Sequence, residues 1–330
     1  MATPLSGNLL LSLRPSKIFS NHVPDTPITS LDFDASGQFL VSAGVDESIH
    51  LYDVTKGKHM KPIYSKKYGC HLARLARKEK TCVYASTKEN DTLRYLSLHD
   101  NSFIRYFKGH TAMVTDVEMG DLNHMFLSSS LDNTVKLWDT RTANCQSSLA
   151  TEQAPNHVAL DPTNSTAAIY NTSTNTLSLH AIGNLTDTPF ESTVCSYVRP
   201  NSVVKVMFMN NNEHILLTTN STEHYILDAF NLKLVARLLR QLPFIDRKYP
   251  DTGNLTVSPD CRFIYGGNGD GSVLVWDMKL LASQDLPTVL NPVKKIENQT
   301  KTLPRMLLFN PQYCVMASAD TELCLWTPTL

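Results

Sequence analysis

Near the middle of the chain, a histidine, two serines and an aspartate stand at spacings that could support nucleophilic chemistry. His110, Ser128 or Ser130, and Asp132 supply the three residue types of the serine hydrolase triad. In that chemistry the imidazole takes the hydroxyl proton, and the carboxylate orients the imidazole. A hydrolase would also need an activating turn such as Gly-x-Ser-x-Gly, and the sequence around these serines does not contain one. We therefore predict no catalytic residues.

Trp138, six residues after Asp132, offers another explanation for the same residues. A buried indole N–H needs a hydrogen-bond acceptor, and Ser128 and Ser130 share one face of a strand by period-two alternation. Asp132 falls in a two-residue turn, where a short polar side chain tolerates left-handed backbone angles. We predict that His110, one or both serines, Asp132 and Trp138 form a structural hydrogen-bond cluster that fixes a β-hairpin.

The residues around this cluster form a unit of short strands that recurs along the chain. Apolar runs at 114–119 and 125–130, then a third run closed by Trp138-Asp139, follow Gly109-His110 in the order expected for one blade of a β-propeller. Six further units are recognised, and the residues aligned with Trp138 are Tyr52, Leu96, His180, Leu227, Trp276 and Trp326. Offsets of 42 to 50 residues fit four short strands per unit. The sequence thus predicts an all-β fold with seven blades.

The two ends of the chain predict how this ring closes. Only four residues follow Trp326, too few for the fourth strand of the last blade. Residues 13–20, upstream of the first blade, are placed to supply that strand. We expect a seven-bladed WD-repeat β-propeller closed by an N-terminal strand, with residues 1–330 forming a single domain. Closure would remove the open sheet edges that otherwise invite aggregation.

Composition argues against several other classes of protein. The apolar content of 42% and formal net charge of −1 describe an ordinary globule, so we expect neither direct nucleic-acid binding nor membrane association. No apolar run approaches the roughly 18 residues that cross a bilayer. The seven cysteines never occur as Cys-x-x-Cys, which favours reduced thiols inside the cell. The histidines show no metal-ligand spacing, so we expect no metal and no cofactor.

Basic and aromatic residues on predicted connections are candidates for binding a partner. Two lysines lie between two tyrosines in the segment Tyr64–Gly69, which combines charge with aromatic contact. The exposed candidates are Lys66, Lys67, Tyr68, Arg94, Arg105 and Arg141. Because basic side chains bind carboxylate and phosphate, these residues predict a docking surface for acidic or phosphorylated segments. The alternative interpretation is that they are solvated loop charges.

Several of the same stretches resemble a known family. They are Tyr64–Gly69, Asp91–Asn101, Ile104–Phe107, Leu137–Asp139, Asn144–Gln146, Asp228–Phe230 and Trp326–Thr329. They closely resemble the Swd-type WD-repeat subunits of the COMPASS histone methyltransferase, and the resemblance covers essentially the entire chain. Residues 194–201 and 243–252 diverge from it.

The resemblance implies a non-catalytic nuclear scaffold that binds short segments of larger subunits. In fungi the family is shared between the complex that methylates histone H3 at lysine four and the machinery of mRNA cleavage, polyadenylation and termination. The implied partners are the methyltransferase catalytic subunit and the cleavage and polyadenylation factor with its phosphatase module. A phosphorylated RNA polymerase II tail would be reached indirectly.

Two other classes of function stay open on the sequence. Many WD propellers are substrate receptors of ubiquitin ligases, although the chain shows no adaptor-binding extension. A propeller enzyme would need carboxylates or histidines that converge in the central channel, and sequence spacing does not exclude such convergence.

Overall fold

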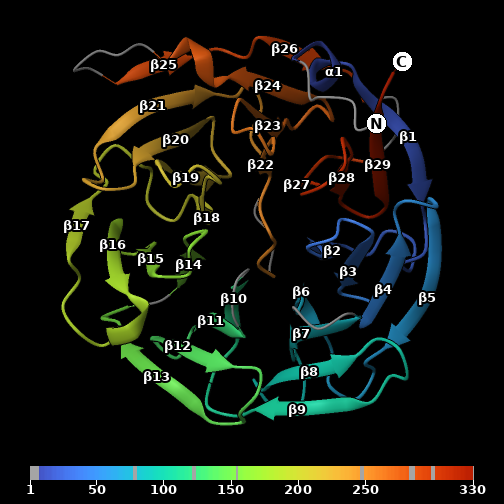
Figure 1. Cartoon of the computed structure of the whole chain (residues 1–330), viewed down its shortest axis with the longest axis vertical. Helices are drawn as coiled ribbons and strands as arrows, with labels where there is room; N and C mark the ends of the chain where they lie inside the picture. The colour runs from blue at the N-terminus through green and yellow to red at the C-terminus, as the bar shows by residue number, and fades with distance from the viewer. Residues whose placement is uncertain are drawn as a thin grey trace.

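The fold is a ring of seven β-sheets around a central axis. A computed structural model describes residues 7–76, 80–120, 124–153, 155–245, 249–281, 287–298 and 302–329. In Figure 1 each sheet forms one blade that extends from the central axis to the rim. The prediction of an all-β, seven-bladed propeller is confirmed.

Blades 1 to 4 each contain four strands that are consecutive in the chain. Blade 1 contains β2 (Ile28–Phe33), β3 (Phe39–Gly44), β4 (Ser48–Asp53) and β5 (Lys58–Tyr64). Blade 2 contains β6 (His71–Leu75), β7 (Thr81–Ala85), β8 (Leu93–Ser97) and β9 (Phe103–Phe107). Blade 3 contains β10 (Val114–Met119), β11 (Met125–Ser130), β12 (Thr134–Asp139) and β13 (Cys145–Ala150). Blade 4 contains β14 (Asn156–Leu160), β15 (Thr166–Asn171), β16 (Thr176–Ala181) and β17 (Glu191–Val194).

Blades 5 to 7 depart from this simple order. Blade 5 contains β18 (Val203–Phe208), β19 (His214–Thr219), β20 (Glu223–Asp228), β21 (Leu234–Leu239) and a fifth strand, β25 (Thr288–Leu290). Blade 6 contains β22 (Leu255–Val257), β23 (Phe263–Gly267), β24 (Val273–Asp277) and β26 (Lys294–Ile296). Blade 7 contains β27 (Met306–Phe309), β28 (Met316–Ala319), β29 (Leu323–Pro328) and β1 (Leu13–Phe19). The short helices are α1 (Gly7–Leu11), η1 (Ile182–Asn184) and η2 (Met278–Leu280).

The N-terminal strand closes the ring, as the sequence predicts. Strand β1 pairs antiparallel with β29, from Leu13 opposite Pro328 to Phe19 opposite Leu323. Leu13 and Phe19 are buried while the residues between them are mostly exposed, so both ends of β1 are fixed in the core. Blade 7 is therefore built from the two ends of the chain, which lie near each other in Figure 1.

The hydrophobic core lies between neighbouring blades. Val41 and Leu51 of blade 1, for example, pack with Ala73 and Tyr84 of blade 2, and each is at most 1% exposed. Strand residues alternate between the two faces of a blade, and both faces of the inner strands are covered by adjacent blades. All six residues of β3 are buried for this reason, whereas the rim strand β13 is exposed at every second residue.

The hairpin between β11 and β12 carries a continuous chain of hydrogen bonds. The Trp138 Nε1–H donates to Ser128 Oγ at 2.8 Å, and Ser128 Oγ lies 2.7 Å from His110 Nε2. His110 Nδ1 lies 2.9 Å from Asp132 Oδ2. Ser130 does not join the chain, because its hydroxyl donates to the Ala112 carbonyl and accepts the Asp132 N–H. Trp138 is fully buried beside these groups.

Blade 1 has the same series of hydrogen bonds, made by different residues. His22 Nδ1 lies 3.0 Å from Asp46 Oδ2, and His22 Nε2 lies 2.8 Å from Ser42 Oγ. Tyr52 stands where blade 3 has tryptophan, and its Oη is 3.4 Å from Ser42 Oγ. The sequence does not reveal His22 as the counterpart of His110, because no glycine precedes it and it stands 30 rather than 28 residues before the aromatic residue.

Blade 6 keeps the tryptophan but lacks the serine. Gly266 pairs with Leu274 at the place where Ser128 stands in blade 3, and no hydrogen-bond partner of Trp276 Nε1 is found among the described residues. A Cβ on Gly266 would lie 2.7 Å from the indole ring. Close packing of the indole ring on a glycine thus replaces the hydrogen bond to serine. Blade 6 retains its four-stranded sheet without the complete series of hydrogen bonds.

Candidate protein-interaction surface

The connection between β5 and β6 is a tight turn that fixes Tyr68. The Tyr68 and Gly69 N–H groups both donate to the Ser65 carbonyl, at 3.1 and 2.7 Å. Gly69 adopts a φ of 65°, and a Cβ there would overlap the Thr87 side chain, so the turn requires glycine. The buried Ser65 hydroxyl fixes the turn to β7 through a 3.0 Å hydrogen bond with Tyr84 Oη. The backbone therefore presents residues 66–68 in one defined conformation.

Arg94 lies beneath this turn instead of on the surface. Its guanidinium Cζ is 3.4 Å from the centroid of the Tyr68 ring. Arg94 Nε donates to Ser86 Oγ at 2.8 Å, and Nη2 donates to Asn90 Oδ1 at 3.2 Å. With 3% of its surface exposed, Arg94 is buried, and the expectation that it is exposed is wrong. The reason is that the β5–β6 turn folds over β8, which the sequence pattern of β8 alone does not show.

Two aromatic residues of β9 extend the surface that begins at Tyr68. The Phe103 ring lies 5.9 Å from Tyr68 and 5.3 Å from Tyr106, and the Arg94 guanidinium is 5.1 Å from Tyr106. Phe103 and Tyr106 are 38% and 39% exposed. Neither residue was among the predicted contacts, although both stand on a short strand with several aromatic residues. Strand β9 and the β5–β6 turn thus form one continuous apolar surface on blade 2.

Lys66 and Lys67 add positive charge to this surface. Both side chains are exposed, with Lys66 Nζ 5.9 Å from the Tyr64 ring and Lys67 Nζ 5.2 Å from the Tyr68 ring. The carboxylate of Glu47, whose backbone binds the same turn, is in an ion pair with Lys88. We call the set of Tyr64, Lys66, Lys67, Tyr68, Phe103 and Tyr106 the aromatic–lysine surface. Its chemistry suits acidic side chains next to apolar ones.

Arg105 and Arg141 lie apart from the aromatic–lysine surface and near each other. Arg105 Nη1 donates to the Thr140 carbonyl of blade 3, one residue before Arg141. The exposed Arg141 pairs with Asp139, with Nη2 and Oδ2 2.7 Å apart. Hydrogen bonds from Arg141 lower the pKa of the Asp139 carboxyl. The structure therefore divides the six predicted contact residues into a group of four around Tyr68 and a pair at the junction of blades 2 and 3.

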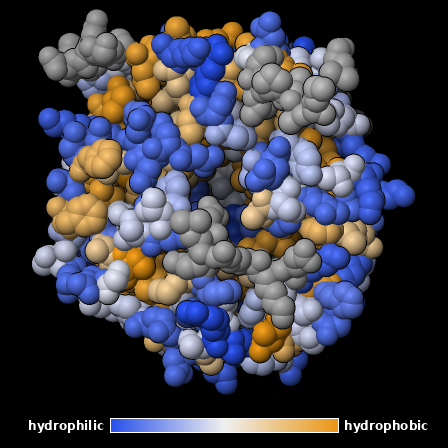
Figure 2. Space-filling view, viewed as in Figure 1, coloured by the Kyte–Doolittle hydropathy of each residue, from blue (hydrophilic) through white to orange (hydrophobic). Residues whose placement is uncertain are grey.

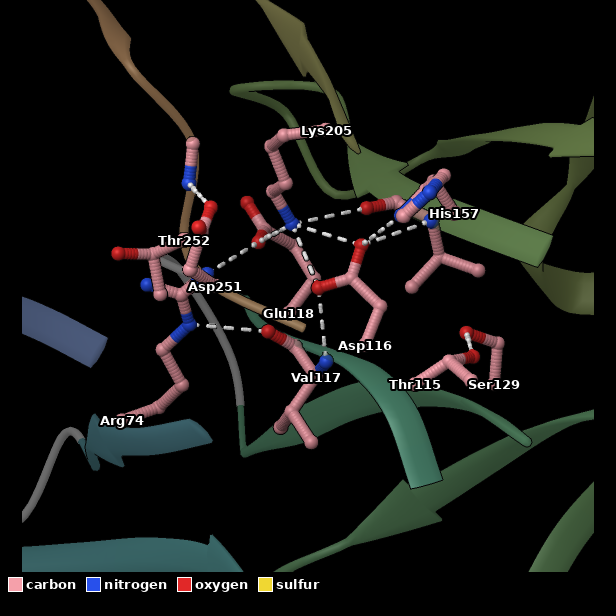
Figure 3. A network of polar contacts seen from close by, with 12 residues as sticks. Arg74, Thr115, Asp116, Val117, Glu118, Ser129, His157, Lys205, Asp251 and Thr252 are labelled. Carbon is pink, nitrogen blue, oxygen red and sulfur yellow. Dashed lines mark hydrogen bonds and ion pairs between the residues drawn. The ribbon is translucent and has the colours of Figure 1, made fainter. Parts of the chain in front are cut away.

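Charged side chains also converge in the central channel. Lys205 Nζ lies 2.9 Å from Asp116 Oδ1 and 2.8 Å from Glu118 Oε2 (Figure 3). Arg74 Nη2 lies 3.6 Å from Glu118 Oε2, and the Val158 N–H donates to Asp116 Oδ2. These residues come from β6, β10, β14 and β18, so the network connects the inner strands of four blades. It is the kind of convergence that a propeller enzyme would require.

The ionisation of Asp116 fits a structural role for this network. Burial disfavours the charged form of Asp116, but the Lys205 ammonium and the His157 hydrogen bond outweigh it, and the pKa of Asp116 lies well below its usual range. A carboxylate that stays charged and paired is a poor proton acceptor near neutral pH. A cavity of about 510 Å³ is lined by Arg74, Glu118 and Lys205 of this network, together with apolar side chains such as Phe33 and Met119. Figure 2 shows the hollow at the centre of one face of the disc.

One cluster in blade 1 has the residue types of a metal site. Ligand atoms of His22, Asp46 and His50 lie within 4.8 Å of one another. Each already takes part in hydrogen bonds: Ser48 Oγ lies 2.9 Å from His50 Nε2 and 3.1 Å from His22 Nδ1. Because His22 and Asp46 belong to the hydrogen-bond chain of blade 1, a structural role explains them. The expectation of no bound metal stays a prediction.

Comparison with known proteins defines first the class and then the family. The family model described as "WD domain, G-beta repeat" matches residues 13–53, 101–139 and 253–277, which contain the anchoring aromatic residues Tyr52, Trp138 and Trp276. The chain is thus a WD-repeat propeller. In the described residues, no helix is both long and apolar enough to span a membrane.

Whole-length similarity identifies the family. The chain is 33% identical to "COMPASS component SWD2" of Saccharomyces cerevisiae, over 94% of each protein. It is 30% identical to "Set1 complex component swd2" of Schizosaccharomyces pombe, over 97% of this chain and 98% of that protein. It is also 30% identical to "WD repeat-containing protein 82" of Drosophila melanogaster, over 100% of this chain and 98% of that protein. The chain belongs to this Swd-type family of WD-repeat proteins.

Proposed function

We propose that this protein is a non-catalytic scaffold subunit of a nuclear COMPASS-type complex that methylates histone H3 at lysine four. The names of the two yeast relatives support membership of such a complex. We further propose that the protein serves in mRNA cleavage, polyadenylation and termination, where the cleavage and polyadenylation factor and its phosphatase module would be its partners. Contact with a phosphorylated RNA polymerase II tail would then be indirect, through these partners.

The observation that carries the scaffold proposal is the aromatic–lysine surface. It combines two exposed lysines, partly exposed aromatic rings and a backbone turn held by internal hydrogen bonds. A surface that is already ordered loses little conformational entropy when a partner segment binds. The paired charges of the central channel, in contrast, leave Asp116 unsuited to proton transfer. We therefore assign binding, not catalysis, to this chain.

Charge reversal on the surface tests this function. We expect Lys66→Glu combined with Lys67→Glu to reduce co-purification of the methyltransferase catalytic subunit at least tenfold, because acidic partner side chains would be repelled. The measurement is affinity purification from cells followed by quantitative mass spectrometry. The melting temperature should stay unchanged, since both lysines are exposed and their substitution removes no core contact.

A matched variant controls for the change in net charge. Lys233 and Lys279 are exposed on blade 5 and beyond β24, and their replacement by glutamate alters the net charge equally. This control should retain the partners. Equal recovery of the methyltransferase subunit with both double variants would contradict the role of Lys66 and Lys67. Recovery of ubiquitin ligase adaptors in place of methyltransferase or polyadenylation subunits would overturn the proposed function.

A further inference from the structure

The rim strands of the blades differ in how much apolar surface they expose. In the described residues, β9 carries more exposed large hydrophobic side chains than any other rim strand: Phe103, Ile104 and Tyr106, each 38% or 39% exposed. The rim strand of the next blade, β13, consists of cysteine, glutamine, serine, leucine and alanine and has no large exposed hydrophobic residue. An open, apolar edge strand is a template for pairing with a further strand.

Blade 5 shows what this propeller does with another apolar rim strand. Strand β21 has the sequence LVARLL, and β25 of the same chain pairs with it in parallel, with Ala236 opposite Thr288 and Leu238 opposite Leu290 (Figure 1). No residue of β21 is among the exposed large hydrophobic residues. The fifth strand thus covers the apolar rim of blade 5 in cis. In the described residues no strand pairs with the outer edge of β9.

The rim strands β5, β9, β13 and β21 share a β-bulge, so these four strands can be compared position by position. The pairing skips one residue at Ile104 in β9, at Gln146 in β13 and at Val235 in β21. Val235 packs against the core cluster of blades 5 and 6, beside the edge that β25 pairs with. Ile104 occupies the same position on blade 2 and is 38% exposed. Blade 2 therefore has the apolar edge of blade 5 without the strand that covers it.

We propose that the outer edge of β9 binds an extended segment of a partner protein as a fifth strand of blade 2. This inference rests on the proposed scaffold function and specifies how the partner is held. Main-chain hydrogen bonds to β9 would supply affinity, and alternate apolar side chains of the segment would pack on Phe103, Ile104 and Tyr106. The segment would have the same relation to β9 that β25 has to β21.

Charge around β9 specifies the chemistry of the segment. Lys66 and Lys67 are exposed beside the Tyr64 and Tyr68 rings, whereas Arg105 of β9 is engaged with the Thr140 carbonyl of blade 3. The nearby Glu47 carboxylate is paired with Lys88 and does not neutralise them. An acidic segment is therefore favoured over a basic one, because its carboxylates would meet the two exposed lysines beside the strand.

Hydrogen exchange tests strand addition directly. The amides of β9 would be compared between the isolated protein and the protein purified in complex with its methyltransferase subunits. We expect those amides of Phe103–Phe107 that point away from β8 to exchange at least tenfold more slowly in the complex, while those of β13 stay unchanged. Equal exchange of β9 in an intact complex would overturn the inference and leave the proposed function standing. Recovery of no methyltransferase subunit would overturn both.

A pair of bulge variants provides the second test. Ile104→Glu places a charge on the proposed binding edge and should lower recovery of the methyltransferase subunit at least tenfold. Gln146→Glu makes a similar change at the corresponding position of β13 and should have no effect on recovery. Melting temperatures of both variants check that the fold is intact, since Ile104 and Gln146 are both partly or fully exposed. Undiminished recovery with Ile104→Glu would contradict the inference.

Discussion

Blades 1 and 3 build the same hydrogen-bond chain from different anchoring residues. In blade 3 a tryptophan N–H donates to Ser128 at 2.8 Å, whereas in blade 1 Tyr52 makes a weaker contact of 3.4 Å with Ser42. The position two residues before the anchor is Lys136 in blade 3 and the buried His50 in blade 1. His50 contacts Ser48 on one side and His59, at 2.9 Å, on the other. The aspartate, histidine and serine are common to both blades, so the anchor is the part that varies.

Removal of the tryptophan anchor should have the largest effect on this comparison. Trp138→Ala deletes a fully buried indole and its hydrogen bond, and we expect a loss of about 3–5 kcal/mol of unfolding free energy. Tyr52→Ala should cost less, because the smaller ring leaves a smaller cavity. Urea unfolding of both variants measures the difference. An equal loss of unfolding free energy in the two variants would show that Trp138 stabilises blade 3 no more than Tyr52 stabilises blade 1.

Acidification should weaken blade 1 through His50. Burial, with the positive charges of His22 and His59, lowers the pKa of His50 to about 3. The unfolded chain binds a proton at this histidine below pH 6.5 but the folded chain does not, so stability falls as the pH drops from 6.5 toward 3. By linkage His50 should remove on the order of 1 kcal/mol by pH 5.5. Unfolding free energies at pH 7.5 and 5.5 test this.

A variant at each of the two corresponding positions isolates the contribution of His50. His50→Gln keeps a polar side chain that does not titrate, and it should reduce the fall in stability between pH 7.5 and 5.5. Lys136→Gln in blade 3 should change that fall less, because the Lys136 charge lowers the pKa of His110 but ranks behind burial and Asp132 among its causes. A pH profile that is the same in wild type and His50→Gln would assign the acid sensitivity to other groups.

The smallest effect should come from Tyr52→Phe, which removes only the hydroxyl of the anchoring residue in blade 1. Tyr52→Phe deletes a hydroxyl whose hydrogen bond is long, and we expect a loss under about 0.5 kcal/mol. Ser128→Ala in blade 3 removes the acceptor of a 2.8 Å bond and leaves a buried indole N–H unpaired, for about 1–3 kcal/mol. Thermal unfolding of the two variants resolves this difference. A larger loss for Tyr52→Phe would reverse the order of the two blades.

The sequence predicted the propeller because its period is long and repeated. Alternating apolar strands and the aligned anchors from Tyr52 to Trp326 mark every blade, and the missing strand after Trp326 indicated closure by residues near 13–20. The fifth strand of blade 5 was not predicted. Strand β25 has only three residues, too few for alternation to distinguish a strand from a loop, and its partner β21 is distant in the chain.

The candidate site was predicted only in part, for a physical reason. Residue type led to the prediction that Lys66, Lys67 and Tyr68 are exposed. Both lysines are exposed and Tyr68 is half-buried, while their role in binding stays a prediction. Residue type placed Arg94 wrongly, because burial there depends on the turn at Gly69 folding over β8. It also gave no warning that Phe103 would join the same surface. Contacts between a loop of one blade and a strand of the next are set by three-dimensional packing, which no local pattern encodes.

The pairing of β1 with β29 has a consequence for biosynthesis. Ser16 donates a hydrogen bond to the Leu325 carbonyl, 309 residues further along the chain. A ribosome that adds about 5–20 residues per second needs roughly 15–60 s to cover that distance. During this interval β1 has left the ribosome but its partner strand β29 has not. The ring is still open, and the sheet edges at both ends of the row of blades are unpaired. A nascent chain of this kind would depend on chaperones until the last strand leaves the exit tunnel.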